Sequence, residues 1–353
     1  MSVSVTNSRR NTVLAAAVGL GVWALLGVAD LPKQPDGGFR SDPGAVVSRI
    51  EVGGAAERAG LRVGDRILGV NGVPLSEIGD IDRLPRAAIG ETRVVAVERP
   101  GVGAAAPARE ELRITYTSQM ANHPVGLIGG AVLALAFLVC GVLALLLVPS
   151  RPGLLFGLAG VWLGVLLGPS PYFTAPGLRS LVLAVQFLVG LPAFACLLHF
   201  TLIFPEPGRI LERKWVVPAI YSPAIVLALA SVIQIAQGGQ AAPSIQLLSA
   251  LASAVYLLLS IVALVRRYAT STPEVRAAFG LGLLVWGMVL GFGPVAIEGV
   301  GLLVAPGVAL PGSDYYFLAM VLIPLSFAAA LLRQRASVRR RGGSPAAGSA
   351  TAT

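Results

Sequence analysis

The feature that most constrains this chain is a series of eight long apolar runs separated by short polar loops. A helix needs about 20 apolar residues to cross the hydrocarbon core of a bilayer. Only 13% of the 353 residues are charged, whereas soluble proteins average about 25%. The sequence therefore predicts a membrane all-α helical bundle of about eight spans. The runs are Thr12–Ala29, Val125–Val148, Leu154–Leu167, Leu181–Phe204, Val216–Ala236, Ile245–Val265, Phe279–Ile297 and Tyr316–Leu332.

The formal net charge of +9 does not indicate a nucleic-acid partner, because residues 30–122, the longest polar stretch, are close to neutral. The basic excess lies in short loops between runs and near the C-terminus. Cytoplasmic loops of membrane proteins collect Lys and Arg. With both termini in the cytoplasm, 14 basic residues fall in inner segments, and the three short outer loops hold only Arg179. This orientation places residues 30–122 outside the cytoplasm. The 25 Arg against 2 Lys favour a bacterial protein, and hence the bacterial cytoplasmic (inner) membrane.

The chain divides into four expected segments. Residues 1–29 form an N-terminal anchor, since their apolar run is longer than the 7–15 residues of a signal-peptide core; a signal peptide cleaved near Ala29 is the alternative. Residues 37–118 form a small soluble domain, and residues 124–333 a seven-helix transmembrane domain. Residues 334–353 are expected to be a disordered, basic cytoplasmic tail, because their end is small and polar.

The soluble domain has the alternating pattern and turn residues of an α+β fold. Its strands are predicted at Ala45–Val52, Arg66–Val70, Thr92–Val97 and Glu111–Thr117. A single helical turn is expected at Ala55–Ala59, with a positive φ at Gly60. Asn71-Gly72 predicts a tight turn between strands. A helix over Ser76–Ala88 would place Ile78, Ile81 and Leu84 on one face.

The stretch GGAAERAGLRVGDRILGVNG, residues 53–72, resembles the core of a PDZ domain. The resemblance covers about 80 residues and assigns Gly54, Gly60, Gly64 and Asp65 to folding rather than to ligand contact. It implies that an extended peptide adds as a strand to a sheet edge, with its carboxylate held by a glycine loop. The residues matching that loop are Gly37, Gly38 and Phe39, followed by an abbreviated groove strand; Ile78, Ile81 and Leu84 would supply side-chain pockets. The alternative is a docking or spacer domain that keeps the fold without binding carboxylates.

A second stretch, LLHFTLIFPEP at residues 197–207, resembles a segment in the membrane input modules of bacterial sensor histidine kinases, several of which carry a PDZ-like domain after the first span. No phosphoacceptor or ATP-binding domain follows in this sequence. An ionisable residue at membrane depth is a functional candidate, which singles out His199 and Glu298. The alternatives are a His199 bonded to a backbone carbonyl and a Glu298 at the membrane interface.

Enzyme motifs are missing from the sequence. Neither His123 nor His199 is followed by the Glu of a zinc-protease H-E-x-x-H helix, and there is no G-x-S-x-G elbow. Cys140 and Cys196 lie in apolar runs, as buried thiols do. We expect no catalytic activity, no cofactor and no metal.

The sequence thus predicts a non-catalytic signalling or sensory input protein of the membrane. It would recognise an extracytoplasmic peptide, protein or small apolar ligand and signal to a separate partner such as a cytoplasmic kinase. The alternative is a membrane-anchored adaptor that recruits an envelope protease or client; a membrane protease is a weaker alternative. Besides a peptide or protein segment, its partner is the lipid bilayer, with no nucleic acid.

Overall fold

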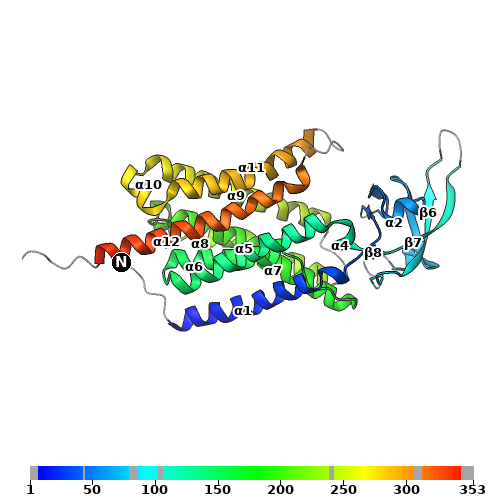
Figure 1. Cartoon of the computed structure of the whole chain (residues 1–353), viewed down its shortest axis with the longest axis horizontal. Coiled ribbons are helices and arrows are strands. Elements are labelled where there is room, and N and C mark those ends of the chain that lie inside the picture. The colour runs from blue at the N-terminus through cyan, green and yellow to red at the C-terminus, as the bar shows by residue number, and fades with distance from the viewer. Residues whose placement is uncertain are drawn as a thin grey trace, which may run out of the picture.

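The computed structural model describes residues 7–42, 44–78, 86–101, 106–237, 242–304 and 312–342. It has two parts, a long bundle of helices and a small sheet domain, residues 35–118, at one end of that bundle (Figure 1). Helix α10 and the C-terminal part of helix α12 lie at the opposite end (Figure 1). Alternation of apolar and polar residues at period 2 builds the sheet domain, and the continuous apolar runs build the helical bundle.

The sheet domain holds three small sheets. The largest has the strand order β5-β4-β6-β7, all antiparallel, and two further pairs join β2 to β3 and β1 to β8. A single bridge from Val46 to Arg66 connects β3 to the largest sheet. The strands are β1 Pro35–Asp36, β2 Phe39–Ser41, β3 Val47–Ile50, β4 Arg66–Val70, β5 Val73–Pro74, β6 Thr92–Arg99, β7 Ala108–Thr115 and β8 Thr117–Ser118.

The turns of the sheet domain follow from the residues that occupy them. Asn71 and Gly72 both have positive φ, 51° and 78°, which is the backbone of a tight hairpin turn between β4 and β5. Gly60 has a φ of 86° directly after the single-turn helix α2, Ala55–Arg58, as its position predicts. The four predicted strands are present: β4 has the predicted ends, and β3, β6 and β7 have shifted ends. Inward-facing Val47, Ile67, Val97 and other apolar residues fill the core between them.

Seven helices among the described residues are long and apolar enough to cross a membrane, judged by length and composition. The remaining predicted span, Leu154–Leu167, corresponds to α6, which has only 17 residues. The helices of the bundle are α1 Asn7–Ala29, α5 Pro124–Leu147, α6 Arg151–Leu167, α7 Pro176–Ile203, α8 Val216–Ala236, α9 Pro243–Thr270, α11 Leu281–Val304 and α12 Leu322–Gly342. Short helices are η1 Leu31–Lys33, α3 Leu75–Ile78, α4 Gln119–Asn122, η3 Arg209–Glu212, α10 Pro273–Phe279 and η4 Ser313–Val321.

Helices α5 and α6 pack backbone to backbone because glycines line their contact. A Cβ atom on Gly160 would lie 2.9 Å from the Cα of Gly141 and 3.0 Å from the carbonyl oxygen of Phe137. A Cβ atom on Gly141 would in turn lie 2.9 Å from the carbonyl oxygen of Gly157. Small residues let helices approach closely in lipid, where packing rather than the hydrophobic effect drives association.

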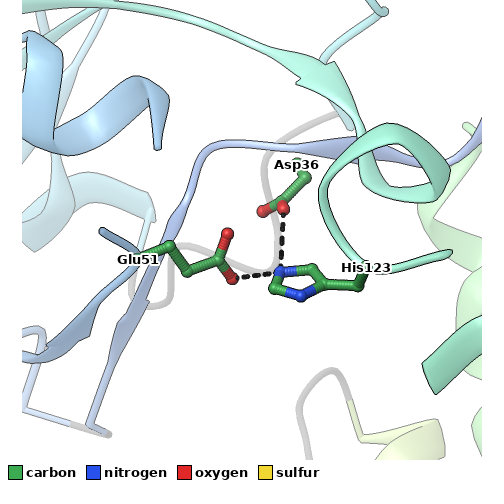
Figure 2. A group of neighbouring side chains, drawn as sticks. All are labelled: Asp36, Glu51 and His123. Atoms are coloured by element: carbon green, nitrogen blue, oxygen red, sulfur yellow. Dashed lines mark ion pairs between the residues drawn. The ribbon is translucent and has the colours of Figure 1, made fainter. Parts of the chain in front are cut away.

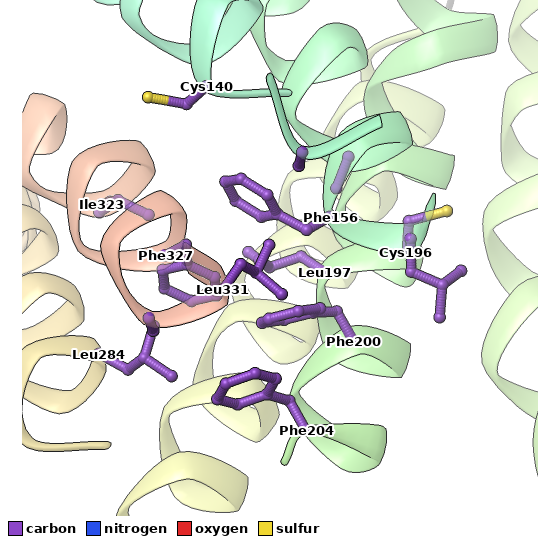
Figure 3. Packing of buried hydrophobic residues seen from close by; sticks show 14 of the residues in the cluster. Cys140, Phe156, Cys196, Leu197, Phe200, Phe204, Leu284, Ile323, Phe327 and Leu331 are labelled. Atoms are coloured by element: carbon purple, nitrogen blue, oxygen red, sulfur yellow. The ribbon is translucent and has the colours of Figure 1, made fainter. Parts of the chain in front are cut away.

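Aromatic side chains from three helices fill the centre of the bundle. Phe156 of α6, Phe200 of α7 and Phe327 of α12 lie with ring centroids 5.2–5.7 Å apart, and Phe204 stacks on Phe200 at 5.3 Å (Figure 3). These separations lie in the range of favourable aromatic pairs. The ring cluster ties the first half of the bundle to its last helix.

Two predicted elements differ from the structure. Helix α12 continues to Gly342, so residues 334–342 are helical rather than disordered; their Arg and Ala residues favour helix, and basic side chains are stabilising at a helix C-terminus. Residues 343–353 lie outside the described part. The helix predicted over Ser76–Ala88 is described only as α3, and Arg86–Ala88 are not helical.

Candidate functional site

The glycine loop, residues 37–39, leads into β2 and is held by the rest of the sheet domain. The amide of Glu51 donates to the carbonyl of Gly38 at 3.0 Å, and the amide of Ala56 donates to the carbonyl of Gly37 at 3.0 Å. Gly38 has a φ of 72°, and a Cβ there would lie 3.0 Å from the nitrogen of Ala55. Glycine is therefore required at this position by both backbone conformation and space.

Strand β2 presents an open edge to any incoming chain. Among the described residues its only strand partner is β3. Phe39 faces Ile50 in that register, next to the hydrogen bond between Glu51 and Gly38. Hydrogen-bonded and non-bonded pairs alternate in antiparallel sheets, so the N–H and C=O of Phe39 point away from β3. An extended peptide could pair with them there, over the short length of three residues.

The predicted pocket residues are only partly described. Ile78 is the last residue of α3, while Ile81 and Leu84 lie outside the described residues. Their role in a groove stays a prediction. The roles of Gly37, Gly38 and Phe39 in ligand binding also stay predictions, although the structure does place them together at the start of β2.

One donor of the glycine loop is already engaged by a side chain. Oδ1 of Asp36 accepts the amide of Gly38 at 2.8 Å. Oδ2 of Asp36 lies 3.7 Å from Nε2 of His123, and Oε1 of Glu51 lies 2.7 Å from the same nitrogen. Figure 2 shows the two carboxylates converging on the imidazole from different segments. We call Asp36, Glu51 and His123 the junction cluster, because His123 caps α5 and so joins the sheet domain to the bundle.

The comparison with known families fits this geometry. Residues 46–99, from the bridge beside β3 to the end of β6, match the sequence profile of the PDZ domain family. They form a PDZ domain. The matched range contains Gly53–Gly72, the stretch that carries the resemblance in sequence, but it begins after the glycine loop. No curated protein and no solved structure matches the chain.

The PDZ domain touches the bundle through the loop between α6 and α7. The Tyr172 hydroxyl donates to the carbonyl of Ala87 at 3.2 Å, and its amide donates to Oδ2 of Asp30 at 3.1 Å. The guanidinium carbon of Arg86 lies 5.1 Å from the centre of the Tyr172 ring. Lys33 hydrogen-bonds Asp30 and, with the Tyr172 amide, holds the pKa of that carboxyl below its usual value. Tyr172 therefore contacts both Asp30, directly after α1, and Ala87, near the end of the range predicted as the groove helix.

The membrane-depth candidate His199 is buried, with 4% of its surface exposed. Its Nδ1 lies 3.1 Å from the hydroxyl of Tyr221 on α8, and its Nε2 lies 3.4 Å from Nη2 of Arg151 on α6. Cys196 lies 3.4 Å from the same hydroxyl. These partners are side chains, not the backbone carbonyl of the alternative interpretation. His199 thus links α6, α7 and α8, and its functional role stays a prediction.

Glu298 is half-buried in α11. No hydrogen bond or ion pair joins its carboxylate to another residue in the described part of the chain. Glu298 is the last residue of the apolar span Leu281–Glu298, which fits the interfacial alternative, and its functional role stays a prediction.

Sequence reasoning missed the junction cluster and Tyr172. Asp36, Glu51 and His123 have no metal-motif spacing, and Tyr172 is an isolated aromatic residue in a short loop. The one local signal was the position of His123 just before Pro124 at the start of an apolar run, which marks it as a helix cap. Their meeting depends on how the sheet domain sits on the bundle.

Proposed function

We propose that this chain is a non-catalytic, multi-pass membrane protein that recognises an extended peptide or protein segment at its PDZ domain. PDZ domains generally bind such segments, and seven apolar helices indicate membrane association. The observation that carries the proposal is the open edge of β2, where the backbone N–H and C=O of Phe39 face away from β3. The ligand would add there as a further strand.

The surroundings of the glycine loop favour a ligand that does not depend on a terminal carboxylate. The amide of Gly38 is already hydrogen-bonded to Asp36, and Glu51 lies beside it in the junction cluster. The carboxylate of a peptide C-terminus would be the third there and, while the cluster holds no cation, would meet like charges, which is unfavourable. We infer that the groove takes an internal segment, or a C-terminus whose carboxylate is not read.

The contacts of Tyr172 support a signalling role over passive docking. They join Ala87, near the end of the range predicted as the groove helix, to Asp30, directly after α1, through the α6–α7 loop. If the segment around Ala87 has two positions, a ligand changes their populations only through the difference between its affinities for the two. We propose that the bundle passes this shift to a separate partner, as in the kinase input modules that residues 197–207 resemble.

Peptide binding to the full chain in lipid nanodiscs tests the proposal. Selected peptides, synthesised as C-terminal acid and C-terminal amide, are titrated and followed by fluorescence polarisation. We expect saturable binding of both forms, with Ile81→Asp and Leu84→Asp weakening it at least tenfold. Val63→Asp, at an exposed turn residue away from β2, is the control and should bind as the parent does. Binding that is unchanged in both groove variants would falsify the groove assignment.

The same samples separate signalling from an adaptor role. Hydrogen exchange is measured with and without saturating peptide. Signalling predicts slower exchange in the α6–α7 loop as well as in β2. Protection confined to the PDZ domain indicates an adaptor that only recruits its partner.

The membrane side of the PDZ domain is part of the proposal, since it rests on the distribution of Lys and Arg. A reporter active only outside the cytoplasm, fused after Gly72, should be active. The same reporter fused after Arg341 should be silent. Activity in the opposite pattern would overturn the proposed orientation.

A further inference from the structure

The junction cluster brings together three side chains that can each bind a metal ion. Asp36 ends β1, Glu51 follows β3 and His123 caps α5, so the cluster joins positions 15 and 72 residues apart in sequence. One donor atom from each lies within 4.8 Å of the others (Figure 2). Their proximity is a product of the tertiary fold, because no local motif places them together.

The donor set suits a divalent transition-metal ion. One imidazole nitrogen and two carboxylate oxygens are ordinary zinc ligands, and two carboxylates match the charge of a divalent cation. Donors bound at about 2.1 Å with tetrahedral angles lie about 3.4 Å from one another. The Nε2 atom of His123 lies 2.7 Å from Glu51 and 3.7 Å from Asp36, which brackets that spacing. The third separation, between the carboxylate oxygens of Asp36 and Glu51, is at most 4.8 Å, and small side-chain rotations would bring it to the same spacing.

The carboxylate of Asp36 is oriented by neighbouring groups, as metal ligands usually are. Its Oδ1 accepts the amide of Gly38, and its Oδ2 accepts Nδ2 of Asn122 at 2.9 Å. The same Nδ2 of Asn122 lies 3.0 Å from the hydroxyl of Thr117. The side chain of His123 is 44% exposed, against 15% for Asp36 and 22% for Glu51. The cluster is therefore fixed on its protein side and open to solvent on the other, which leaves an entry path and room for water ligands.

We propose that Asp36, Glu51 and His123 bind one divalent transition-metal ion of the Zn²⁺ class, which fastens the glycine loop of the PDZ domain to the start of α5. The ion would sit between two carboxylates and neutralise them. It would hold the N-cap residue of α5 against the loop that precedes β2. Its occupancy can be measured without any peptide, so a failure of the metal site is distinguishable from a failure of peptide recognition.

Metal binding by the full chain tests the site directly. The protein is purified in detergent through a histidine-free affinity tag, stripped with a chelator and titrated with Zn²⁺ by calorimetry, with bound metal counted by mass spectrometry. We expect one Zn²⁺ per chain and much weaker binding of Mg²⁺. Glu51→Gln and His123→Ala should each weaken Zn²⁺ binding at least about tenfold. Glu111→Gln, at an exposed carboxylate on β7, is the matched control and should bind as the parent does.

A fold readout keeps the test decisive. Hydrogen exchange of β4 and β6 should be the same in the parent and in Glu51→Gln, which conserves side-chain volume. The visible spectrum of bound Co²⁺ should show nitrogen coordination in the parent and lose it in His123→Ala. Failure of the parent to retain Zn²⁺, or an unchanged affinity in folded Glu51→Gln, overturns the proposal and leaves the cluster as a histidine–carboxylate ion pair.

Discussion

Asp65 is the residue whose charge contributes most clearly to the sheet domain. Its side chain is 1% exposed and receives two hydrogen bonds of 2.9 Å from Arg99 and one from the amide of Arg62. Nη2 of Arg99 also donates to the carbonyl of Gly60. The Gly-Asp pair of the sequence pattern therefore positions a carboxylate that joins the turn before β4 to the end of β6.

Asp65→Asn is expected to destabilise the PDZ domain by about 2 kcal/mol, since the buried carboxylate loses its charge-assisted bonds to Arg99, which keeps Glu110 as its other ionic partner. Hydrogen exchange of β4 and β6 amides in the full chain measures the free energy of local opening. Arg109→Gln is the control, because Arg109 is 77% exposed and pairs with Glu98 at 3.4 Å. It should change that free energy by less than about 1 kcal/mol. Equal effects of the two substitutions would contradict the assignment.

The same carboxylate predicts that the free energy of opening of the domain decreases at acidic pH. Burial alone raises the pKa of Asp65, but hydrogen bonds from Arg99 and the Arg62 amide outweigh it and leave the pKa below its usual value. Such a group stabilises the fold above its unfolded pKa of about 3.9, and this stability is lost as pH falls through the lower folded pKa. Opening free energy, corrected for intrinsic exchange, should be flat near neutral pH and fall below about pH 4. In Asp65→Asn the opening free energy should fall less steeply with decreasing pH. An equally steep fall in the variant would mean that another group causes the pH dependence.

At the scale of elements, the α5–α6 pair depends on glycines that a spacing pattern alone does not rank. A Cβ on Gly160 would press on the backbone of Gly141, whereas a Cβ on Gly126 of α5 would meet nothing within 4 Å. Gly160 lies in α6 and Gly126 in α5, so both belong to the same helix pair. The difference comes from which face of each helix meets its neighbour.

Gly160→Ala is expected to destabilise the bundle by about 1–3 kcal/mol through overpacking. Gly126→Ala should be neutral or slightly stabilising, because alanine favours helix over glycine. Thermal unfolding of the two variants in the same detergent, followed by tryptophan fluorescence, compares them. If Gly126→Ala lowered the midpoint as much as Gly160→Ala, close packing of α5 on α6 would not be the cause.

At the scale of the whole molecule, Tyr172 joins the PDZ domain to the bundle. Its hydroxyl bond to Ala87 and its ring beneath Arg86 are each worth about 1 kcal/mol. Tyr172→Ala removes both contacts and should therefore raise hydrogen exchange roughly thirtyfold in residues 86–91 and in the α6–α7 loop. Tyr172→Phe, which keeps the ring, should show a smaller rise.

Tyr315→Ala serves as the comparison for that measurement, because Tyr315 is 54% exposed on η4, in another part of the bundle. It should leave exchange in residues 86–91 unchanged. An unchanged exchange rate in Tyr172→Ala would mean that the two parts are held together by other contacts, such as the junction cluster.

Features that depend only on neighbouring residues could be predicted before the structure was known. Positive φ at Gly60, Asn71 and Gly72, the short turn of α2 and the strand β4 follow from local backbone preferences and period-2 alternation. The apolar runs predicted the helices for the same reason. The PDZ assignment also came from local spacing, and the family comparison confirmed it for residues 46–99.

Only the tertiary structure decided which distant residues meet. The convergence of Asp36 and Glu51 on His123 and the bond from Tyr172 to Ala87 join segments far apart in sequence. No periodicity encodes such pairs, because each partner is set by how two folded parts dock. The fold could thus be predicted from sequence, while the chemistry beside the groove could not.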